Sequence, residues 1–424
     1  MMSILLLLTA TFAVLTWTDL HKGLFLLVAV LPSYLLRTDI FGIPTTLLEL
    51  FIVAFLLIWT IKFLGSHRLQ PATNHSTERR LKPATTSLTI FFILLVATIS
   101  ILVAPDMTSA LGVWKAYFLE PILLFFVVRY ELEHGEVKGS RLFEALGLCA
   151  IVLSLIAIFQ WLTGMGLPIP WDIEHRVTSV FDYPNALGLF LGPIVIIAVM
   201  SLRKVRGIRL FWLLVTILSS IAIILAQSEA ALVSIVATLF IAGLIHRKTR
   251  MLSSGLLVLL ILLVLLFPPI LSKLTLQDYS GSVRLSQWTE TTDMLRDHWF
   301  LGAGLSGYPT VFEPYHQATY LEIFQYPHNI FLNIWVELGL LGLVAFALLA
   351  MSVIRKVAPR LKPGATTFPP FHLSILPFLA LLQMTIHGLV DVPYFKNDLA
   401  ILTWILLAII FAYARHTPSL SKTS

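Results

Sequence analysis

The chain has 424 residues, of which 58% are hydrophobic and only 12% are charged, and its mean hydropathy is +0.88. Soluble domains carry about 25% charged residues, so this composition excludes an ordinary soluble protein and predicts an all-α, polytopic transmembrane helical bundle. The formal net charge is +6, but the basic residues lie in short loops between apolar segments, as the positive-inside rule describes. We therefore expect no nucleic-acid partner.

Apolar segments of membrane-crossing length follow one another along the chain, and we expect about 12 of them to span a roughly 30 Å hydrocarbon core. In chain order they are residues 2–17, 23–36, 43–64, 86–104, 110–129, 142–163, 186–202, 209–226, 230–245, 251–270, 329–354, 371–391 and 398–414. The first lacks the basic n-region of a cleavable signal peptide, so we expect it to stay in the membrane. The second is short and contains Pro32, which is compatible with a re-entrant segment.

The distribution of Lys and Arg predicts the orientation of the chain. The basic segments are residues 62–82, 203–209, 246–250, 355–362 and the tail from Arg415. All of them fall on one side if every span from the third onward crosses once, and the positive-inside rule makes this side cytoplasmic. The opposite face then carries residues 163–186, 227–230 and the long loop 271–328.

The long loop separates two groups of membrane helices. Within it, residues 282–299 predict an amphipathic helix at the membrane surface, and residues 300–316 predict a Gly-rich turn and loop. Loops of this length in compact proteins are usually functional or disordered, and the aromatic residues here favour order. We expect one integral membrane domain made of N-terminal helices in 1–270, the extracytoplasmic loop 271–328 and C-terminal helices in 329–424.

Polar residues interrupt the apolar stretch "QYPHNIFLNIWVELGLLGLVAF". Asn329, Asn333 and Glu337 are spaced i, i+4, i+8 and predict a polar stripe that descends into the membrane, with His328 in the first helical turn. Such groups often mark function, although helix–helix hydrogen bonding is the alternative for Asn and Glu. The positive end of a helix dipole disfavours imidazolium, and a neutral imidazole is what a general base requires.

Two outward arginines are candidate phosphate ligands. Arg284, with Trp288 one helical turn later, can bind a substrate's phosphates in a bidentate way or bind a lipid phosphate non-specifically. Arg176 lies in the outward segment before another span and offers a second phosphate contact. Asn185 follows Pro184 there, and a helix cap is its alternative role.

His387 and Asp391 are spaced i, i+4 near the outer end of another span, in "HGLVDVPYF". They can pair with each other or line a cavity, and we favour a buried structural pair. The chain has no Walker A loop, no dinucleotide fingerprint, no His/Cys cluster with metal spacing and no GxSxG elbow. We therefore expect no metal and no cofactor; an enzyme of this sequence would use His and Arg.

These residues carry a resemblance to a known family. The chain is similar to the O-antigen ligase and O-antigen polymerase superfamily of bacterial membrane proteins, whose pattern is an Arg, a Trp, a Gly-rich "GxGxxxY/F" and "HNxxLxxxxExGxxG". The matching positions are Arg284, Trp288, Gly302, Gly304, Tyr308, His328, Asn329, Leu332, Glu337, Gly339 and Gly342. The stretches "YPNALGLFL" and "HGLVDVPYF" are similar to weaker family features.

The resemblance implies a glycosyltransferase at the outer face of the bacterial cytoplasmic membrane. Its donor would be a saccharide on undecaprenyl diphosphate, and its acceptor a hydroxyl of a glycan, lipid or protein. His328 corresponds to the family's catalytic base and Arg284 to the cation that holds the diphosphate. Family ligases often carry another arginine in an "SRG"-like motif, where this chain has Glu229 in "AQSEAALVS". Either Arg176 replaces that cation or the chemistry of this member differs.

Alternative functions stay open at this point. An O-antigen or exopolysaccharide polymerase would share the same motifs. A small-anion transporter would use the same Arg and His for binding, although the inverted repeats that favour a transporter are not evident. A scaffold protein of an envelope-assembly complex would make the outward polar residues dispensable.

Overall fold

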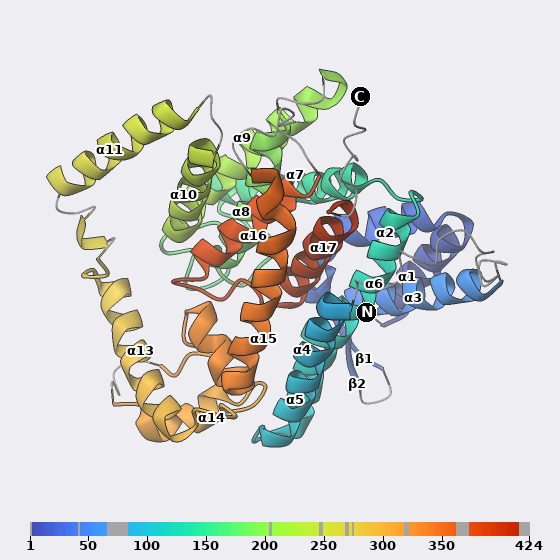
Figure 1. Ribbon diagram of the computed structural model, residues 1–424, viewed down its shortest axis with the longest axis horizontal. Helices are drawn as coiled ribbons and strands as arrows, with labels where there is room; N and C mark the ends of the chain where they lie inside the picture. Colours follow the sequence, from blue (N-terminus) through green and yellow to red (C-terminus); the bar gives the residue numbers. More distant parts are fainter. Residues whose placement is uncertain are drawn as a thin grey trace, which may run out of the picture.

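Apolar helices make up most of the chain in the computed structural model (Figure 1). The structure describes residues 2–40, 43–65, 84–202, 206–245, 249–267, 271–273, 275–317, 322–361 and 373–414. The all-α polytopic bundle predicted from the sequence is confirmed. Within the described ranges, 6 helices are long and apolar enough to cross a membrane, and shorter apolar helices accompany them.

The long apolar helices are α3 (Leu47–Gly65), α4 (Ala84–Val103), α5 (Met107–Trp114) continued through a π-helical turn into α6 (Glu120–Glu133), α7 (Gly139–Thr163), α8 (Pro184–Ser201) and α15 (Ile330–Leu361). The shorter ones are α1 (Met2–Thr18), α2 (Leu20–Ala29), α9 (Arg209–Leu225), α10 (Glu229–Ile245), α11 (Arg250–Leu266), α16 (Ile375–His387) and α17 (Asn397–Tyr413). Much of the basic sequence that predicts the orientation lies outside the described residues, namely 66–82, 203–205, 246–248, 362 and the tail from Arg415. The sidedness therefore remains a prediction.

The second apolar segment differs from the expected continuous span 23–36. Helix α2 ends at Ala29, and a 3-10 turn follows over Leu31–Leu35. Pro32 at the start of this turn has no N–H to continue the helix. A short antiparallel hairpin of β1 (Arg37–Ile40) and β2 (Ile43–Thr46) then leads into α3.

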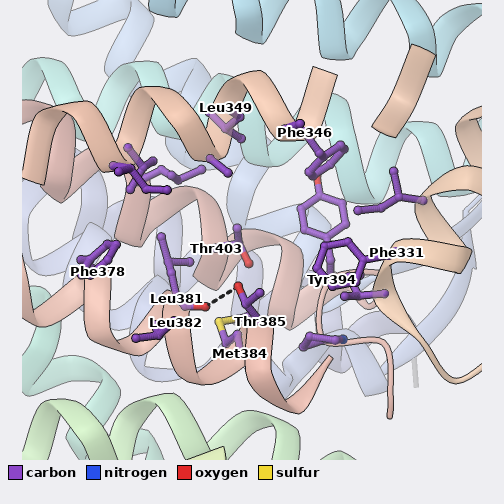
Figure 2. Close-up of a pocket in the computed structure, with 18 of the residues that line it drawn as sticks. Phe331, Phe346, Leu349, Phe378, Leu381, Leu382, Met384, Thr385, Tyr394 and Thr403 are labelled. Carbon is purple, nitrogen blue, oxygen red and sulfur yellow. Dashed lines mark hydrogen bonds between the residues drawn. The ribbon is translucent and has the colours of Figure 1, made fainter. Parts of the chain in front are cut away.

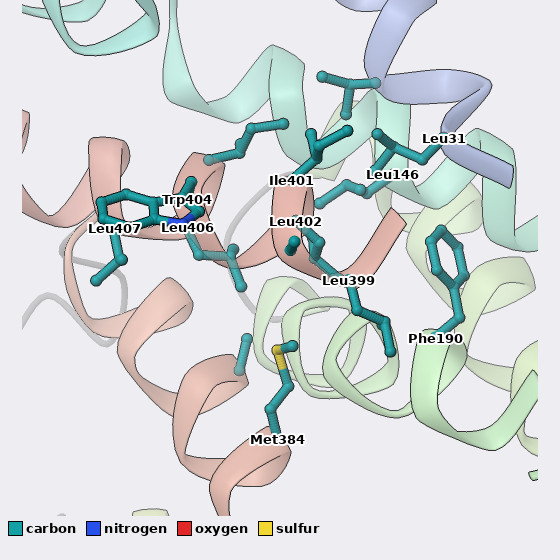
Figure 3. Close-up of a cluster of buried hydrophobic side chains, with 14 of the residues drawn as sticks. Leu31, Leu146, Phe190, Met384, Leu399, Ile401, Leu402, Trp404, Leu406 and Leu407 are labelled. Atoms are coloured by element: carbon teal, nitrogen blue, oxygen red, sulfur yellow. The ribbon is translucent and has the colours of Figure 1, made fainter. Parts of the chain in front are cut away.

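Helix α17 lies at the centre of the bundle and packs most extensively against α6. Nearly every residue from Asn397 to Ala412 is buried, including Trp404 with 0% exposure. Figure 3 shows how α17 side chains meet Phe190 of α8, Met384 of α16 and Leu146 of α7. A helix that is apolar all round is buried on all sides, so α17 forms the core of the bundle and anchors the segment that precedes it.

The loop between the two groups of membrane helices is ordered around α13 (Tyr279–Asp297) and α14 (Tyr308–Phe312). Helix α13 begins three residues before the predicted 282–299 because the Asp278 carboxylate caps it, accepting from the Gly281 N–H at 3.1 Å. A small apolar cluster joins α13, α14 and α15: Met294, Leu295, Ala303, Tyr308, Phe312 and Val336. In Figure 1, α13 lies to the left of the lower part of α15, and α14 lies near the lower end of α15.

Helix α15 is broken at Gly339, whose φ is 68° and ψ is −171°. The break frees backbone groups that a membrane protein must pair internally. The loop after α13 pairs them: the Ala303 N–H donates to the Val336 carbonyl at 2.7 Å, and the Leu340 N–H donates to the Phe300 carbonyl at 3.0 Å. Only glycine tolerates this approach, because a Cβ on Gly339 would lie 2.1 Å from the Phe300 carbonyl oxygen.

We predict that Gly339→Ala destabilises the protein. A backbone with φ 68° and ψ −171° is nearly restricted to glycine and costs an alanine about 1–3 kcal/mol, and the clash with Phe300 adds to this. Unfolding temperature in detergent, followed by fluorescence, should fall by several degrees. Gly255→Ala is the matched control, since a Cβ there meets nothing within 4 Å. Equal unfolding temperatures for the Gly339→Ala variant and the wild type would contradict the role of this contact.

Candidate active site

A polar cluster forms where the loop helix α13 meets the beginning of α15 and the end of α16. We use "polar cluster" for Arg284 and Gln287 on α13, His328 before α15, His387 at the end of α16, and Asp391 between α16 and α17. Three segments that are distant in sequence therefore contribute to one place. Two of the five, His328 and Arg284, are the residues that the family pattern singles out.

The Arg284 side chain is fixed by hydrogen bonds. Its Nε donates to the Val390 carbonyl at 3.1 Å, and its Nη1 donates to the carbonyl and hydroxyl of Ser280 at 3.2 and 2.6 Å. None of these acceptors is a carboxylate, so the guanidinium charge is not neutralised by a direct ion pair. Among the described residues, Nη2 has no hydrogen-bond partner. The geometry leaves a positively charged group that is held in place and can receive an anion.

His328 lies just outside α15. The sequence predicts His328 in the first helical turn, but the helix begins only at Ile330. His328 therefore precedes the first turn. Its φ of 47° turns the backbone before the helix starts. Trp288 on α13 fixes this turn, because its indole Nε1 donates to the Pro327 carbonyl at 2.7 Å. Burial and the nearby Arg284 guanidinium lower the pKa of His328 to about 4, against an opposing effect of the Tyr326 backbone.

Asn329 caps α15. Its Oδ1 accepts from the backbone N–H groups of Phe331 and Leu332 at 3.0 and 3.1 Å, and its Nδ2 donates to the Leu389 carbonyl at 3.0 Å. This is the usual role of Asn at a helix N-terminus. The cap also ties α15 to the end of α16, together with the Ile330 N–H that donates to the Gly388 carbonyl at 2.7 Å. Asn329 therefore has a clear structural function besides the substrate-binding role expected from the sequence.

The two other members of the predicted polar stripe are buried in α15. Glu337 accepts from the backbone N–H of Ser306 at 2.6 Å, so it links the helix to the Gly-rich loop just before the break. Both side-chain polar atoms of Asn333 are buried and have no hydrogen-bond partner in the described structure. A buried amide without partners is costly, so Asn333 is the member of the stripe that its protein contacts do not explain.

His387 and Asp391 are both buried, at 1% and 2% exposure, but they do not form the expected hydrogen-bonded pair. Neither ring nitrogen of His387 has a partner among the described residues, and Asp391 accepts instead from the Val392 N–H at 2.8 Å. The reason is that α16 ends at His387, so the i, i+4 spacing does not place the two on one helical face. Burial raises the pKa of Asp391 to about 6, while Val392, Arg284 and Lys396 lower it.

Arg176 and Glu229 are held by contacts of their own. Arg176 Nε donates to the Ala226 carbonyl at 3.1 Å, its Nη1 lies 3.4 Å from Glu174, and its guanidinium lies 5.0 Å from the Trp171 ring. Glu229 forms an ion pair with Lys273. Glu229 thus does not present an uncompensated negative charge.

Asn185 and Trp288 complete the predicted substrate-binding residues. Asn185 is half-buried in the first turn of α8, behind Pro184. Tyr183, and not Asn185, is the residue that precedes the helix as its cap, and it makes no side-chain cap bond. Asn185 is therefore not the N-cap residue of α8, and the alternative role as a helix cap is wrong. Trp288 contacts the turn before His328, as described above.

Sequence reasoning missed four polar residues near this place. Gln287 contacts His328, and the hydroxyls of Tyr183 and Tyr326 lie 3.2 Å apart. The Nζ of Lys396 has no hydrogen-bond partner among the described residues. It lies 4.0 Å from the centre of the Phe181 ring and 3.9 Å from the Asp398 carboxylate. Burial lowers the pKa of Lys396, and Asp398, Asp391 and Asp182 oppose this. The sequence signal was "YFKND", which places a cation directly before an apolar span.

An apolar groove of about 530 Å³ begins beside the polar cluster and runs between α15, α16 and α17 (Figure 2). Its lining includes Ile330, Phe331, Phe346, Leu382, Met384 and Tyr394. Ile330 and Phe331 follow His328 closely in sequence. Met384 lies about one helical turn before His387, so two segments of the polar cluster continue directly into the groove.

The few polar atoms that line the groove are already satisfied. The hydroxyls of Thr385 and Thr403 donate to carbonyls one turn back in their own helices, at 2.9 and 2.8 Å. The Tyr394 hydroxyl donates to the Tyr117 carbonyl at 2.7 Å. The groove therefore has no free hydroxyl to bind a sugar, and its apolar lining suits a hydrocarbon chain.

Comparison with known proteins agrees with the sequence resemblance. A family model described as O-antigen ligase matches residues 214–347, a region that contains both Arg284 and His328. An O-antigen ligase of Salmonella typhimurium is 24% identical over 309 residues, which cover 68% of this chain and 73% of the relative. Together with the apolar helical fold, the two matches support the resemblance of this multi-pass membrane protein to the O-antigen ligase superfamily.

Proposed function

We propose that this protein transfers a saccharide from undecaprenyl diphosphate to an acceptor hydroxyl at the outer face of the bacterial cytoplasmic membrane. The observation that carries the proposal is the meeting of a fixed cation, Arg284, and a neutral imidazole, His328, at one end of an apolar groove. A ligand with an anionic head and a long hydrocarbon tail fits these two environments together.

Arg284 holds the diphosphate of the donor. As the glycosidic bond breaks, negative charge grows on the departing undecaprenyl diphosphate, and a preorganised cation stabilises that charge more in the transition state than in the ground state. Its Nε and Nη1 are anchored on Val390 and Ser280, so little reorganisation is needed. Arg176 is a weaker candidate for the diphosphate because Glu174 partly offsets its charge. We assign Arg176 to contacts with the glycan instead.

His328 takes the proton of the acceptor hydroxyl. The acceptor oxygen bonds to the anomeric carbon, the bond from that carbon to the diphosphate oxygen breaks, and the proton moves to the imidazole. A pKa of about 4 keeps the imidazole neutral at pH 7. The nearby guanidinium is one cause of the low value, so a bound diphosphate that neutralises Arg284 raises the basicity of His328 once the donor is in place.

The apolar groove holds the part of the undecaprenyl tail nearest to the diphosphate. Transfer of the tail from lipid to the groove exchanges one hydrocarbon environment for another and yields little hydrophobic free energy. The groove therefore selects by shape, and the affinity comes mainly from the head group.

The catalytic roles are tested by transfer assays with purified protein in vesicles that contain a lipid-diphosphate-linked glycan and candidate acceptors. His328→Ala should lower the rate by at least about 10²-fold, since general-base catalysis contributes 10²–10⁴. Arg284→Ala should lose about 10²–10³, and Arg284→Lys should recover only part of this because it lacks the planar fork.

Arg296→Ala is the matched control for these variants. Arg296 lies on the same helix α13, is 75% exposed and pairs with Asp293, so its loss should leave transfer within about twofold, as for most surface changes. Full activity of a folded His328→Ala variant would rule out the proposed base. Extension of the donor's own repeat unit without transfer to any separate acceptor would indicate a polymerase.

The groove is tested by filling it. Ala347→Trp places a ring in the lining, about 25 Å along α15 from Ile330 at 1.5 Å per residue. Overpacking costs about 1–3 kcal/mol, so kcat/KM for the undecaprenyl donor should fall roughly tenfold. A geranyl donor has two isoprene units and does not reach this point, so its use should be unchanged. Val344→Trp, on the same helix but outside the lining, is the control. Equal losses with both donors would contradict the groove as the tail site.

A further inference from the structure

Gln287 is buried between α13 and the turn that carries His328. It lies one helical turn after Arg284 and is only 5% exposed. Its Nε2 donates to the Tyr326 backbone carbonyl at 3.0 Å and to the Tyr308 hydroxyl at 3.4 Å. Its Oε1 lies 3.3 Å from Nδ1 of His328. All three contacts are polar, and each restricts how the amide can be oriented.

The orientation of this amide follows from its partners. The backbone carbonyl of Tyr326 can only accept a hydrogen bond, so the NH₂ group of Gln287 must face it. The Tyr308 hydroxyl shares a hydrogen bond of 2.8 Å with Thr291 and is fixed on the same side. The carbonyl oxygen of the amide then faces His328 and can only accept.

An acceptor opposite Nδ1 determines the tautomer of a neutral imidazole. The proton must lie on Nδ1 to satisfy the amide oxygen, which leaves Nε2 with a free lone pair. In this state Nε2 is the nitrogen that can take a proton. The hydrogen bond to the other nitrogen also fixes the direction of the ring, as the orienting partner does in other nucleophile–base arrangements.

We infer that Gln287 is a positioning residue that holds His328 in the Nδ1-protonated tautomer, so that Nε2 accepts the proton of the acceptor hydroxyl. The inference rests on the proposed function, in which His328 is the base. Gln287 does not touch the substrate and acts through His328 alone.

A neutral amide suits this place better than the carboxylate that orients histidine in many hydrolases. A carboxylate next to His328 would stabilise imidazolium and would compete with the diphosphate for Arg284. The groups that face His328 are the Arg284 guanidinium of α13, the backbone and ring of Tyr326, and the Phe324 ring. His387 and Asp391 are also buried, and the Arg284 charge acts on both. Gln287 thus fixes the tautomer without adding negative charge to a site for an anion.

The tautomer can be measured without any substrate. Nitrogen NMR at pH 7 on protein labelled with ¹⁵N-histidine distinguishes protonated from unprotonated ring nitrogens, and the His328 signals are assigned by their loss in His328→Ala. We expect a protonated Nδ1 and an unprotonated Nε2 in the wild type. In Gln287→Leu, the Nε2-protonated form that water favours should appear. A wild-type ring protonated on Nε2, or a tautomer unaffected by Gln287→Leu, would overturn the inference.

Kinetics separate positioning from a loss of structure. In Gln287→Leu, kcat should fall about 10–100-fold, the range found for outer partners of functional histidines, with the KM for the donor unchanged. Gln287→Glu should move the acid limb of the kcat/KM profile to higher pH by one unit or more, because the carboxylate raises the pKa of His328. An unshifted profile in a folded Gln287→Glu variant would contradict the inference. If the tautomer is as expected but His328→Ala still transfers, the proposed function fails and the tautomer assignment stands.

Discussion

Backbone hydrogen bonds between the loop after α13 and the broken part of α15 hold the two halves of the candidate site together. The break at Gly339 frees groups on α15, and the segment Phe300–Ala303 satisfies them. Gly302 allows the approach from the other side, because a Cβ there would lie 2.2 Å from the Val336 carbonyl oxygen. This junction acts together with the hydrogen bonds from Trp288 to Pro327 and from Gln287 to Tyr326, which hold the loop helix α13 against the turn of His328.

Charge is distributed around Arg284 so that the guanidinium stays available. Its hydrogen bonds go to backbone carbonyls and a serine hydroxyl, and its charge is one of the influences that lower the pKa of the buried Asp391. A direct ion pair would have neutralised the cation, and an isolated cation would have been expensive to bury. The Arg284 guanidinium instead has uncharged hydrogen-bond acceptors, which offset the cost of burial without neutralising its charge. Burial lowers the pKa of His328 and so keeps it neutral, and the same positive charge acts in this direction too.

The apolar period and the motif positions of the sequence predict much of this architecture. Segments near 20 residues long predict the helices, and the family resemblance implies that Arg284 on α13 and His328 before α15 share a role. The failures have local causes. The end of α16 at His387 separates that residue from Asp391, and Pro32 shortens α2. The spacing of Asn329, Asn333 and Glu337 predicts one polar stripe but not what each residue does. Asn329 caps the helix, and Glu337 accepts from the Ser306 N–H.

Contacts across long sequence distances could not be read from the chain. Gln287 is an ordinary polar residue in a polar helix, and only the folded turn of Tyr326–His328 gives its amide an orientation. Lys396 likewise acquires its aromatic surroundings from Phe181, far away in sequence. No periodicity within one helix encodes such pairs. Composition predicts which groups are costly to bury, and the fold determines which of them meet.

The location of the groove has a consequence for how a lipid-linked donor would be recognised. A tail that moves from the bilayer into an apolar groove gains little free energy, because both surroundings are hydrocarbon. The groove lining offers no free polar atom that could distinguish one lipid from another. Discrimination between lipids must then come from the head group, which would meet the fixed Arg284. A lipid with the same tail but without a diphosphate would enter the groove and remain weakly bound. In the proposed function, the fixed guanidinium at the mouth would therefore select the donor, while the groove would place its glycosidic bond beside His328.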